Sequence, residues 1–180
     1  LLKAKIFDSL DEKGQKLLTL SYYNCERLAH LVNDILNMEK IAAGKMEYFL
    51  EAVDVNPFIQ DIIARNQSYG DKYDVLFKFA YETDKITCFV DKNRFEQALV
   101  NVLSNAAKFS LANTEVIIRA DRISDEEVEI SIKDTGEGIP EAFKDKIFGK
   151  FTQANSSSTR SKGGTGLGLN ITKSIIEAFG

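Results

Sequence analysis

Apolar side chains recur at helical spacing through the first part of the chain. They occupy every third or fourth position from Leu17 to Ile41, which predicts a long amphipathic helix, and Ala43 and Gly44 supply a stop. The stripe is wide, so we expect the helix to pack against more than one neighbour, as in a helical hairpin. The polar residues 11–14 break the pattern and suggest a turn between two antiparallel helices. A single helix docked on the following domain is the alternative, and the stripe alone does not separate the two.

The pattern changes after this helix. Residues 46–50 alternate as a short strand, with Met46, Tyr48 and Leu50 on one face, and Asn56-Pro57 looks like the N-cap and first residue of a helix to about residue 69. Further strands are predicted over residues 75–81, 86–90, 115–120 and 128–133, the last two as a hairpin, and helices from Asp91 to near Ser110, over 140–148 and from about 169 to the end. This order predicts a helical piece ahead of a mixed α/β domain.

Composition and charge narrow the function classes. The chain has 180 residues, a formal net charge of −4 and no basic stripe, so nucleic acid is not an expected partner. No stretch has the length and apolar character of a membrane span, and no signal peptide opens the chain, so no membrane contact by this segment is expected. Cys25 and Cys88 have neither zinc-site spacing nor the density of a disulfide scaffold, and both are expected as small buried residues in a reducing compartment.

The helix after Asp91 carries candidate chemistry. Asn101, Asn105 and Lys108 are spaced i, i+4, i+7 and share one face. The opposite, core face is expected to hold Phe95, Leu99, Val102, Ala106 and Phe109. Amide oxygens can hold a magnesium ion between phosphates without repelling them, so we expect Asn105 as the metal ligand, Asn101 near the phosphates and Lys108 as a phosphate-directed charge. Any helix with a clean core face carries polar residues outward, so this face alone is a moderate signal.

An acidic turn follows the hairpin. Asp134 ends a strand and enters a turn with Gly136 and Gly138, which permit close backbone approach to a flat ligand. A buried carboxylate there can accept a hydrogen bond from the exocyclic amine of adenine, whereas guanine presents an acceptor and is rejected. The alternative is an ordinary Asp-Gly hairpin turn. Against it, Ile139-Pro140 follows at once and no paired strand resumes.

A glycine cluster, residues 163–168, precedes the last helix. Backbone N–H groups at a helix start make an anion site, and glycines let phosphates approach. The cluster is not a P-loop, because no Gly-Lys-Ser/Thr occurs, and no strand leads directly into it as in a Rossmann fingerprint. The serine-rich residues 155–162 precede it, and Arg160 and Lys162 suit a lid that closes over nucleotide. A merely flexible surface loop is the competing interpretation.

Together these residues resemble the catalytic, ATP-binding domain of bacterial sensor histidine kinases. The asparagine helix resembles their N box, residues 134–139 the G1 box, 147–153 the F box and 163–168 the G2 box, and residues 26–36 resemble the second helix of their dimerisation hairpin. The resemblance covers nearly the whole chain. It implies an α+β fold of the GHKL or Bergerat type: a two-layer α/β sandwich in which helices cover a mixed sheet, preceded by an N-terminal helical hairpin segment.

The resemblance also implies domains and a site. Residues 1–44 would be a partial dimerisation hairpin and residues 45–180 the catalytic domain, cut before its last strands. ATP and Mg²⁺ are the implied cofactors, with Asn105 and Lys108 as catalytic residues and Asn105 as the metal ligand. The positions expected to bind nucleotide are Asn101, Asn105, Lys108, Phe109, Asp134, Gly136, Gly138, Ile139, Phe148, Phe151, Arg160, Lys162, Gly163, Gly164, Thr165, Gly166, Leu167 and Gly168.

Three departures from the family pattern qualify this. The phosphoacceptor box is absent, and the one histidine, His30, lies in the second helix, where a structural or surface role is expected. Residues 1–10 would then be the tail of the first helix. The chain stops at Gly180, where the family continues into strands that cover a sheet edge, so we expect part of a longer protein. Asn170 stands where the family usually has a small residue.

The function implied is a kinase core that transfers the γ-phosphoryl group of ATP to a histidine outside this sequence. The same resemblance implies relay to an aspartate of a response-regulator receiver domain, a homodimer through the N-terminal helices, and a cytoplasmic location, either free or as the cytoplasmic portion of a membrane-bound sensor. The chain itself is expected to bind nucleotide without phosphorylating itself. The alternatives are a clamp-type GHKL ATPase, disfavoured by residues 26–36 and by Asn101 in place of a water-activating glutamate, and a non-catalytic dimerising scaffold.

Overall fold

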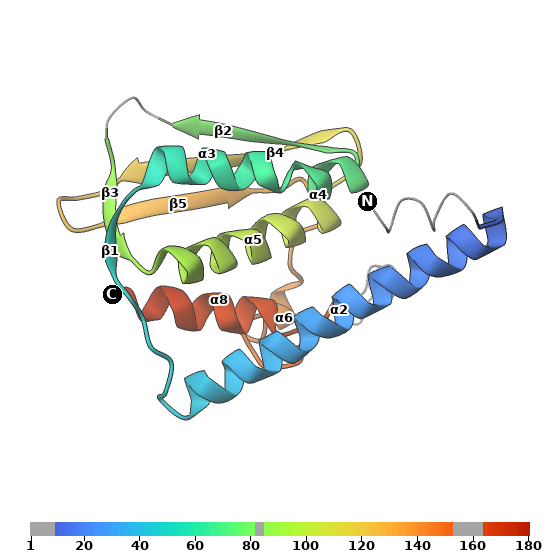
Figure 1. The fold of residues 1–180 in the computed structure, drawn as a ribbon. Helices are drawn as coiled ribbons and strands as arrows, with labels where there is room; N and C mark the ends of the chain where they lie inside the picture. Colours follow the sequence, from blue (N-terminus) through green and yellow to red (C-terminus); the bar gives the residue numbers. More distant parts are fainter. Residues whose placement is uncertain (1–9, 82–84, 153–163) are drawn as a thin grey trace. The chain divides into compact units, whose positions relative to one another are not determined.

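The computed structural model describes residues 10–81, 85–152 and 164–180, and the chain forms two compact units, residues 1–45 and 46–180. The first unit contains helix α2, Glu12–Ala42, which confirms the predicted long helix (Figure 1). The predicted turn at residues 11–14 is wrong, because the Asp11 carboxylate caps the helix by accepting a hydrogen bond from the Gly14 N–H (2.8 Å). Gly44, with φ +63°, follows the helix end. The expected preceding helix falls mainly on residues 1–9, outside the described residues.

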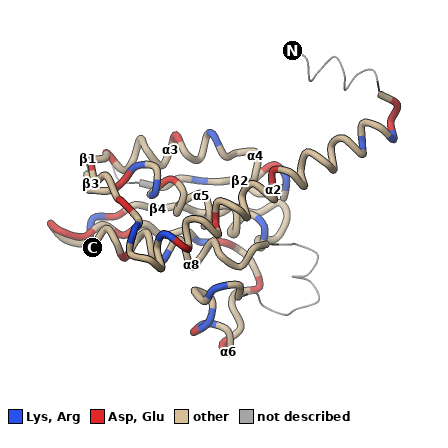
Figure 2. The backbone as a smooth tube through the Cα atoms, turned by 60° about the horizontal axis from the view of Figure 1, so that its bottom comes forward, with Lys and Arg blue, Asp and Glu red and all other residues tan. Residues whose placement is uncertain are grey.

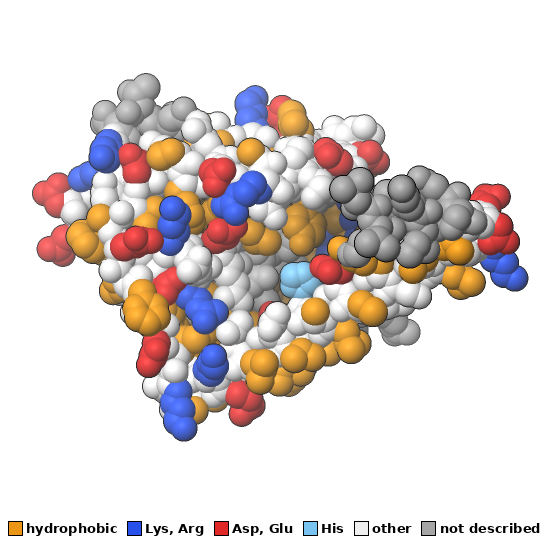
Figure 3. Space-filling model, in the orientation of Figure 1, with side chains coloured by type: hydrophobic (Ala, Val, Ile, Leu, Met, Phe, Trp, Pro, Cys, Tyr) orange, Lys and Arg blue, Asp and Glu red, His pale blue; other side chains and the backbone are white. Residues whose placement is uncertain are grey.

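Most of the apolar stripe of α2 is exposed, although Met38 is buried. Leu17, Leu28 and Leu36 keep 57%, 65% and 54% of their surface, and Figure 3 shows apolar side chains gathered along this helix. Within residues 10–45, α2 is the single described helix, so the described part of its own unit holds no second helix to cover the stripe. For the same reason Cys25 is exposed, and its expected burial is wrong. None of the helices in the described ranges combines the length and apolar character needed to cross a membrane.

The second unit is a two-layer sandwich. Its elements are β1 (Glu51–Asp54), α3 (Val55–Arg65), α4 (Gln67–Lys72), β2 (Val75–Tyr81), β3 (Thr87–Val90), α5 (Lys92–Phe109), β4 (Thr114–Arg122), β5 (Val128–Lys133), α6 (Glu141–Lys144) and α8 (Gly168–Glu177). Strands β1 and β3 pair antiparallel, β4 pairs parallel with β2, and β5 pairs antiparallel with β4. Helices α3, α5 and α8 form the other layer (Figure 1). The predicted α+β class with a mixed sheet is confirmed.

The core lies between these layers. Alternate residues of β4 are fully buried, namely Val116, Ile118 and Ala120. On α3, Ile62 is fully buried and Ile59 is almost fully buried. They meet the core face of α5, which is formed by Phe95, Ala98, Leu99, Leu103, Ala106 and Ala107.

The predicted core face of α5 is wrong at two positions. Val102 is only partly buried and Phe109 keeps 37% of its surface, while Leu103 is buried instead. The predicted set repeats every seven residues, or 3.5 per turn. An α-helix has 3.6 residues per turn, so over two heptads such a stripe drifts by about 40° off the buried face. Phe109, at the end of the stripe, therefore leaves the core.

Several boundaries also differ from the predicted ones. Residues 46–50 form no strand, because pairing with β3 begins at Glu51, opposite Val90. Helix α3 begins at Val55, with Asp54 as N-cap, so Pro57 is its third residue, and the helix breaks at Asn66 before α4. The short helix α6 covers only residues 141–144. The serine-rich residues 155–162 lie outside the described part of the chain.

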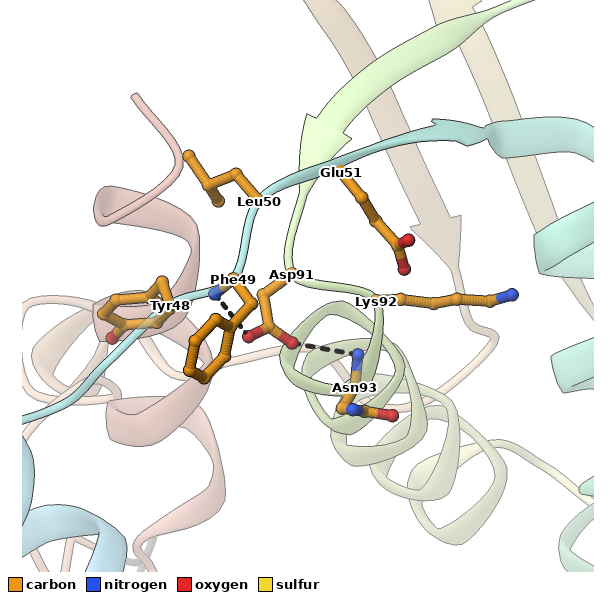
Figure 4. A pocket seen from close by; sticks show the side chains of 7 residues that line it. All are labelled: Tyr48, Phe49, Leu50, Glu51, Asp91, Lys92 and Asn93. Carbon is orange, nitrogen blue, oxygen red and sulfur yellow. Dashed lines mark hydrogen bonds between the residues drawn. The ribbon is translucent and has the colours of Figure 1, made fainter.

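One carboxylate fixes residues 46–50 in place of strand pairing. Asp91 is 6% exposed, and its Oδ1 accepts hydrogen bonds from the Asn93 and Arg94 N–H groups (both 3.0 Å), which confirms the predicted cap of α5. Its Oδ2 accepts from the Phe49 N–H (3.0 Å), as Figure 4 shows beside the hollow lined by Tyr48 to Glu51 and Asp91 to Asn93. Burial by itself raises the pKa of Asp91, but the three N–H groups and the Arg94 charge outweigh it, so the pKa lies below its ordinary value.

We predict that Asp91→Asn separates the two roles of this side chain. An asparagine oxygen still caps α5, but the amide NH₂ faces the Phe49 N–H and cannot accept from it. The expected loss is about 2 kcal/mol of unfolding free energy at neutral pH, since hydrogen bonds to charged groups are the stronger ones. Urea unfolding measures it. The matched control is Asp54→Asn, because the Asp54 side chain makes no capping hydrogen bond, and it should cost less than about 0.5 kcal/mol.

The lowered pKa of Asp91 also predicts that the stability difference between the native chain and Asp91→Asn depends on pH. A carboxylate with a lowered folded-state pKa stabilises fully above its unfolded pKa, ordinarily 3.8, and this contribution is lost as pH falls through the folded value. The difference between the native chain and Asp91→Asn should therefore be constant near neutral pH and shrink in acid. A difference that is constant down to acid pH would contradict the account.

Candidate functional site

Helix α5 carries the predicted polar face along the border of α8. Asn101, Asn105 and Lys108 are all partly buried, in keeping with positions at the edge of the core face. The Asn101 Nδ2 donates to the carbonyl oxygen of Gly168 (3.3 Å), the first residue of α8. A Cβ on Gly168 would lie 3.4 Å from the Asn101 side chain, at van der Waals contact distance, so the two residues are direct neighbours. The middle of α5 thus lies against the start of α8.

The end of α5 meets the glycine segment, which we define as residues 164–168. A Cβ on Gly164 would lie 3.2 Å from the Lys108 Nζ, and this Nζ also lies 4.6 Å from the centre of the Phe109 ring. The lysine charge is therefore held beside backbone that carries no side chain. An ammonium group in that place can attract an anion that approaches the glycine segment.

The acidic turn, residues 134–138, packs against the last residues of α5. A Cβ on Gly136 would lie 2.7 Å from the Phe109 carbonyl oxygen, so only glycine allows the two backbones to come this close. The Thr135 N–H donates to the Ser110 Oγ (3.4 Å), which holds the turn at the C-cap of α5. Asp134 Oδ1 accepts from the Gly136 N–H (2.7 Å). The expected burial of Asp134 is wrong: its turn lies at the margin of the sheet, and the carboxylate is exposed.

The F segment, residues 148–152, lies on the glycine segment. Gly166 has φ +72°, and a Cβ there would lie 2.9 Å from the Phe151 carbonyl carbon. Phe151 itself has φ +57°, a conformation that non-glycine residues seldom adopt. Its ring is exposed, and so is that of Phe148. Leu167, by contrast, is fully buried, so its side chain belongs to the core and only its backbone borders the glycine segment.

The structure therefore joins the predicted motifs through α5. Direct contacts connect α5 with the glycine segment and with the acidic turn, and the glycine segment with the F segment. Asn105 lies on α5 between Asn101 and Lys108. Gly138, the last residue of the acidic turn, and Ile139 after it are exposed. Arg160, Lys162 and Gly163 lie outside the described residues. The ligand-binding roles of all these residues stay predictions.

Sequence reasoning missed the polar residues that hold the segments together. Ser110 accepts from the acidic turn, and Thr114 and Thr135 share a hydrogen bond between their hydroxyl oxygens (2.6 Å). Asn170, on the first turn of α8, donates from Nδ2 to the Phe148 carbonyl oxygen (2.7 Å). Ser110 and Thr114 carry no motif signal. Thr135 lies inside the acidic turn, and Asn170 was visible as a departure from the family pattern.

The residues present suit a nucleoside triphosphate with its cation. The N-terminal N–H groups of α8 favour an anion, and no acidic residue in its first turn repels one. Lys108 adds positive charge nearby. In the described parts of the chain, no cluster of three or more His, Cys, Asp or Glu side chains could hold a metal ion alone. A magnesium ion here would therefore depend on phosphate oxygens together with an amide oxygen such as that of Asn105. Figure 2 shows α6, with charges of both signs, on a loop that projects from the two layers.

Comparisons with known proteins identify relatives of this chain. The family model of histidine kinase-, DNA gyrase B-, and HSP90-like ATPases matches residues 90–180, which include α5, the acidic turn and the glycine segment. The sensor protein kinase WalK of Staphylococcus saprophyticus is 34% identical over 168 residues, which cover 93% of this chain and 27% of WalK. The chain thus spans about a quarter of this relative's length.

Solved structures share the fold. Full-length ShkA in complex with AMPPNP matches with a TM-score of 0.79 and 26% identity, over 94% of this chain and 35% of ShkA. The histidine kinase ThkA in complex with the response regulator protein TrrA matches with a TM-score of 0.69 and 23% identity, over 99% of this chain and 49% of that chain. At that identity the second likeness concerns the fold alone.

We predict that two glycines of the site differ in what a methyl group costs. Gly138 and Gly166 have nearly the same φ, +76° and +72°, but a Cβ on Gly138 meets nothing within 4 Å, whereas one on Gly166 meets the Phe151 backbone. Gly138→Ala should cost about 1 kcal/mol of unfolding free energy, from backbone strain alone. Gly166→Ala should cost about 3 kcal/mol, because the F segment must also move. Urea unfolding compares the two, and equal costs would contradict the close packing of the F segment.

Proposed function

The chain belongs to the histidine kinase-, DNA gyrase B- and HSP90-like ATPases, and from this membership we propose that it is the kinase core of a sensor histidine kinase. In this proposal residues 45–180 form the catalytic domain and residues 1–44 part of the dimerisation hairpin. The observation that carries it is the junction of α5 with both glycine-bearing segments, at Gly168 and at Gly136. A single helix then presents amide and ammonium groups between two glycine-bearing segments, where the absence of side chains lets a nucleotide approach the backbone.

Each motif has a role at the nucleotide. The Asp134 carboxylate accepts from the exocyclic amine of adenine, and its exposure leaves it open to ligand before binding. The N–H groups at the start of α8 and the Lys108 ammonium hold the phosphates. The Asn105 amide oxygen binds Mg²⁺, which supplies neutralisation of the developing phosphate charge when bound. The likeness to ShkA, which was solved with AMPPNP, supports nucleotide at this place.

The reaction is phosphoryl transfer to histidine. An imidazole nitrogen of a histidine outside this sequence forms a bond to the γ-phosphorus, the bond from that phosphorus to the bridging oxygen breaks, and ADP leaves. This chain's residues contribute position and charge rather than covalent chemistry: α5 and the glycine segment orient the phosphates, and Lys108 neutralises them. His30 is exposed on α2 and is not the proposed acceptor.

Two partners are part of the proposal. The exposed stripe of α2, with Leu17, Leu28 and Leu36, is the surface by which two copies of the parent protein would dimerise. A response-regulator receiver domain would then take the phosphoryl group on an aspartate, and the complex of ThkA with TrrA supports this kind of partner. A clamp-type ATPase, or a scaffold that dimerises through α2 without binding nucleotide, are the alternatives. Affinity for Mg²⁺-ATP excludes the scaffold.

We predict that Asn105→Ala removes the magnesium dependence of ATP binding. The native chain should bind ATP at least about tenfold more tightly with Mg²⁺ than with EDTA, because Asn105 would hold the cation and its charge would attract the phosphates. In Asn105→Ala the two affinities should become equal. Titration calorimetry measures both. The control is Asn93→Ala, an exposed asparagine in the first turn of the same helix, which should keep the native magnesium dependence. A magnesium dependence that survives in Asn105→Ala would reject this residue as the ligand.

A second test concerns self-phosphorylation. Incubation of the chain with γ-labelled ATP should leave no acid-labile label on the protein, since the proposed acceptor histidine lies elsewhere. Alkaline quenching and gel autoradiography provide the measurement, with a His30→Gln chain alongside. Label that appears on the native chain and disappears in His30→Gln would show that His30 is the acceptor and overturn this part of the proposal.

A further inference from the structure

The F segment is held by few buried side chains. Across residues 141–152 none is fully buried, and α6 contributes no residue to the core. Phe148 keeps 41% of its surface and Phe151 keeps 61%. Apolar burial therefore stabilises this stretch only weakly. Its position must come from specific contacts, and two places supply them.

The first place is Gly166, against which the Phe151 backbone packs. The second is the opening turn of α8, where the Asn170 Nδ2 donates to the Phe148 carbonyl oxygen at 2.7 Å. One turn further along, the Lys173 Nζ lies 5.6 Å from the centre of the Phe148 ring. Lys173 also pairs with Glu177 (3.6 Å). The Asn170 bond joins residues 22 positions apart in the chain.

The helix end of this contact is firmly anchored. Leu167, Ile171 and Ile175 of the same helical stretch are all fully buried, and α5 packs along α8. The Asn170 side chain thus extends from a fixed element to a weakly held one. A serine or alanine at this position has too short a side chain to reach the Phe148 carbonyl in the same way.

We propose that Asn170 is a positioning residue for nucleotide binding, which docks the F segment on the glycine segment before ATP arrives. This inference rests on the proposed function. A segment that is already in place loses less conformational freedom when ligand binds, so the docking raises affinity without a new contact to the nucleotide. Removal of the bond leaves the core of α8 intact and frees the F segment to depart from Gly166.

The experiment compares Asn170→Ala with Ile176→Ala in the full chain. Ile176 lies on the same helix and is 46% exposed, so its replacement makes a similar truncation away from the F segment. Hydrogen exchange of the Gly149 amide, which donates to the Lys146 carbonyl (2.8 Å), reports the F segment without nucleotide. Titration with Mg²⁺-ATP and urea unfolding complete the set.

The expected result is selective. In Asn170→Ala the Gly149 amide should exchange about fivefold faster and the dissociation constant for Mg²⁺-ATP should rise about fivefold, the factor that loss of one typical hydrogen bond gives. The unfolding free energy measured in urea should fall by less than the binding free energy, because the higher helix propensity of alanine offsets part of the lost bond. Ile176→Ala should change neither exchange nor affinity. Asn170→Gln, which keeps the amide donor, should recover part of the affinity.

Three outcomes would overturn the inference. Unchanged Gly149 exchange would show that Asn170 does not hold the F segment. Faster exchange with unchanged affinity would show that the docking does not serve nucleotide binding, and a fall in the unfolding free energy that matches the loss of binding free energy would assign Asn170 a structural role. Failure of the native chain itself to bind Mg²⁺-ATP would instead defeat the proposed function and with it the binding role, while the exchange measurement still decides whether Asn170 docks the segment.

Discussion

The structure depends on one helix that has to satisfy two environments at once. Helix α5 buries Phe95, Leu99 and Leu103 in the core, and on its flank it carries Asn101 and Lys108 against glycine backbone. The core face fixes the rotation of the helix about its axis, because any turn would expose apolar surface and bury amides. Because the rotation of the helix is fixed, the positions of the polar groups on its flank follow from hydrophobic packing. A site built on a buried helix is correspondingly precise.

Both ends of α5 are also fixed. At the N-terminus the Asp91 carboxylate caps the helix and holds Phe49, and at the C-terminus Ser110 receives the acidic turn. Between them, Gly164 and Gly168 of the glycine segment lie beside α5, and the F segment packs on the glycine segment at Gly166. The stability of these elements therefore decreases outward, from the buried helix α5 to the weakly held F segment. That gradient suits a site that must admit a large anionic ligand and then enclose it.

Local signals in the sequence predicted the elements well. The aromatic-rich run of β2, the β-branched run of β5, the Asp91 cap and the glycine start of α8 each depend on neighbouring residues, so these patterns can be recognised in a single sequence. Most of the wrong predictions concern residues whose contacts lie far away in the sequence. Residues 46–50 alternate like a strand, yet the Phe49 N–H among them donates to Asp91. Phe109 leaves the core because the helical period is 3.6 rather than 3.5. Cys25 is exposed because no described element of its own unit covers it. The Asn170 contact with Phe148 links two motifs across a stretch of chain that no local pattern can span.

The central claim is that α5, the acidic turn and the glycine segment form one nucleotide site. The most direct measurement is a titration of the isotopically labelled chain with Mg²⁺-ATP, followed by the backbone amide resonances of Asn101, Gly136 and Gly166. The account predicts that all three shift along one saturation curve with a single dissociation constant, while amides of the far strand β1 do not move. Shifts confined to one of the three segments, or three unrelated curves, would contradict a shared site.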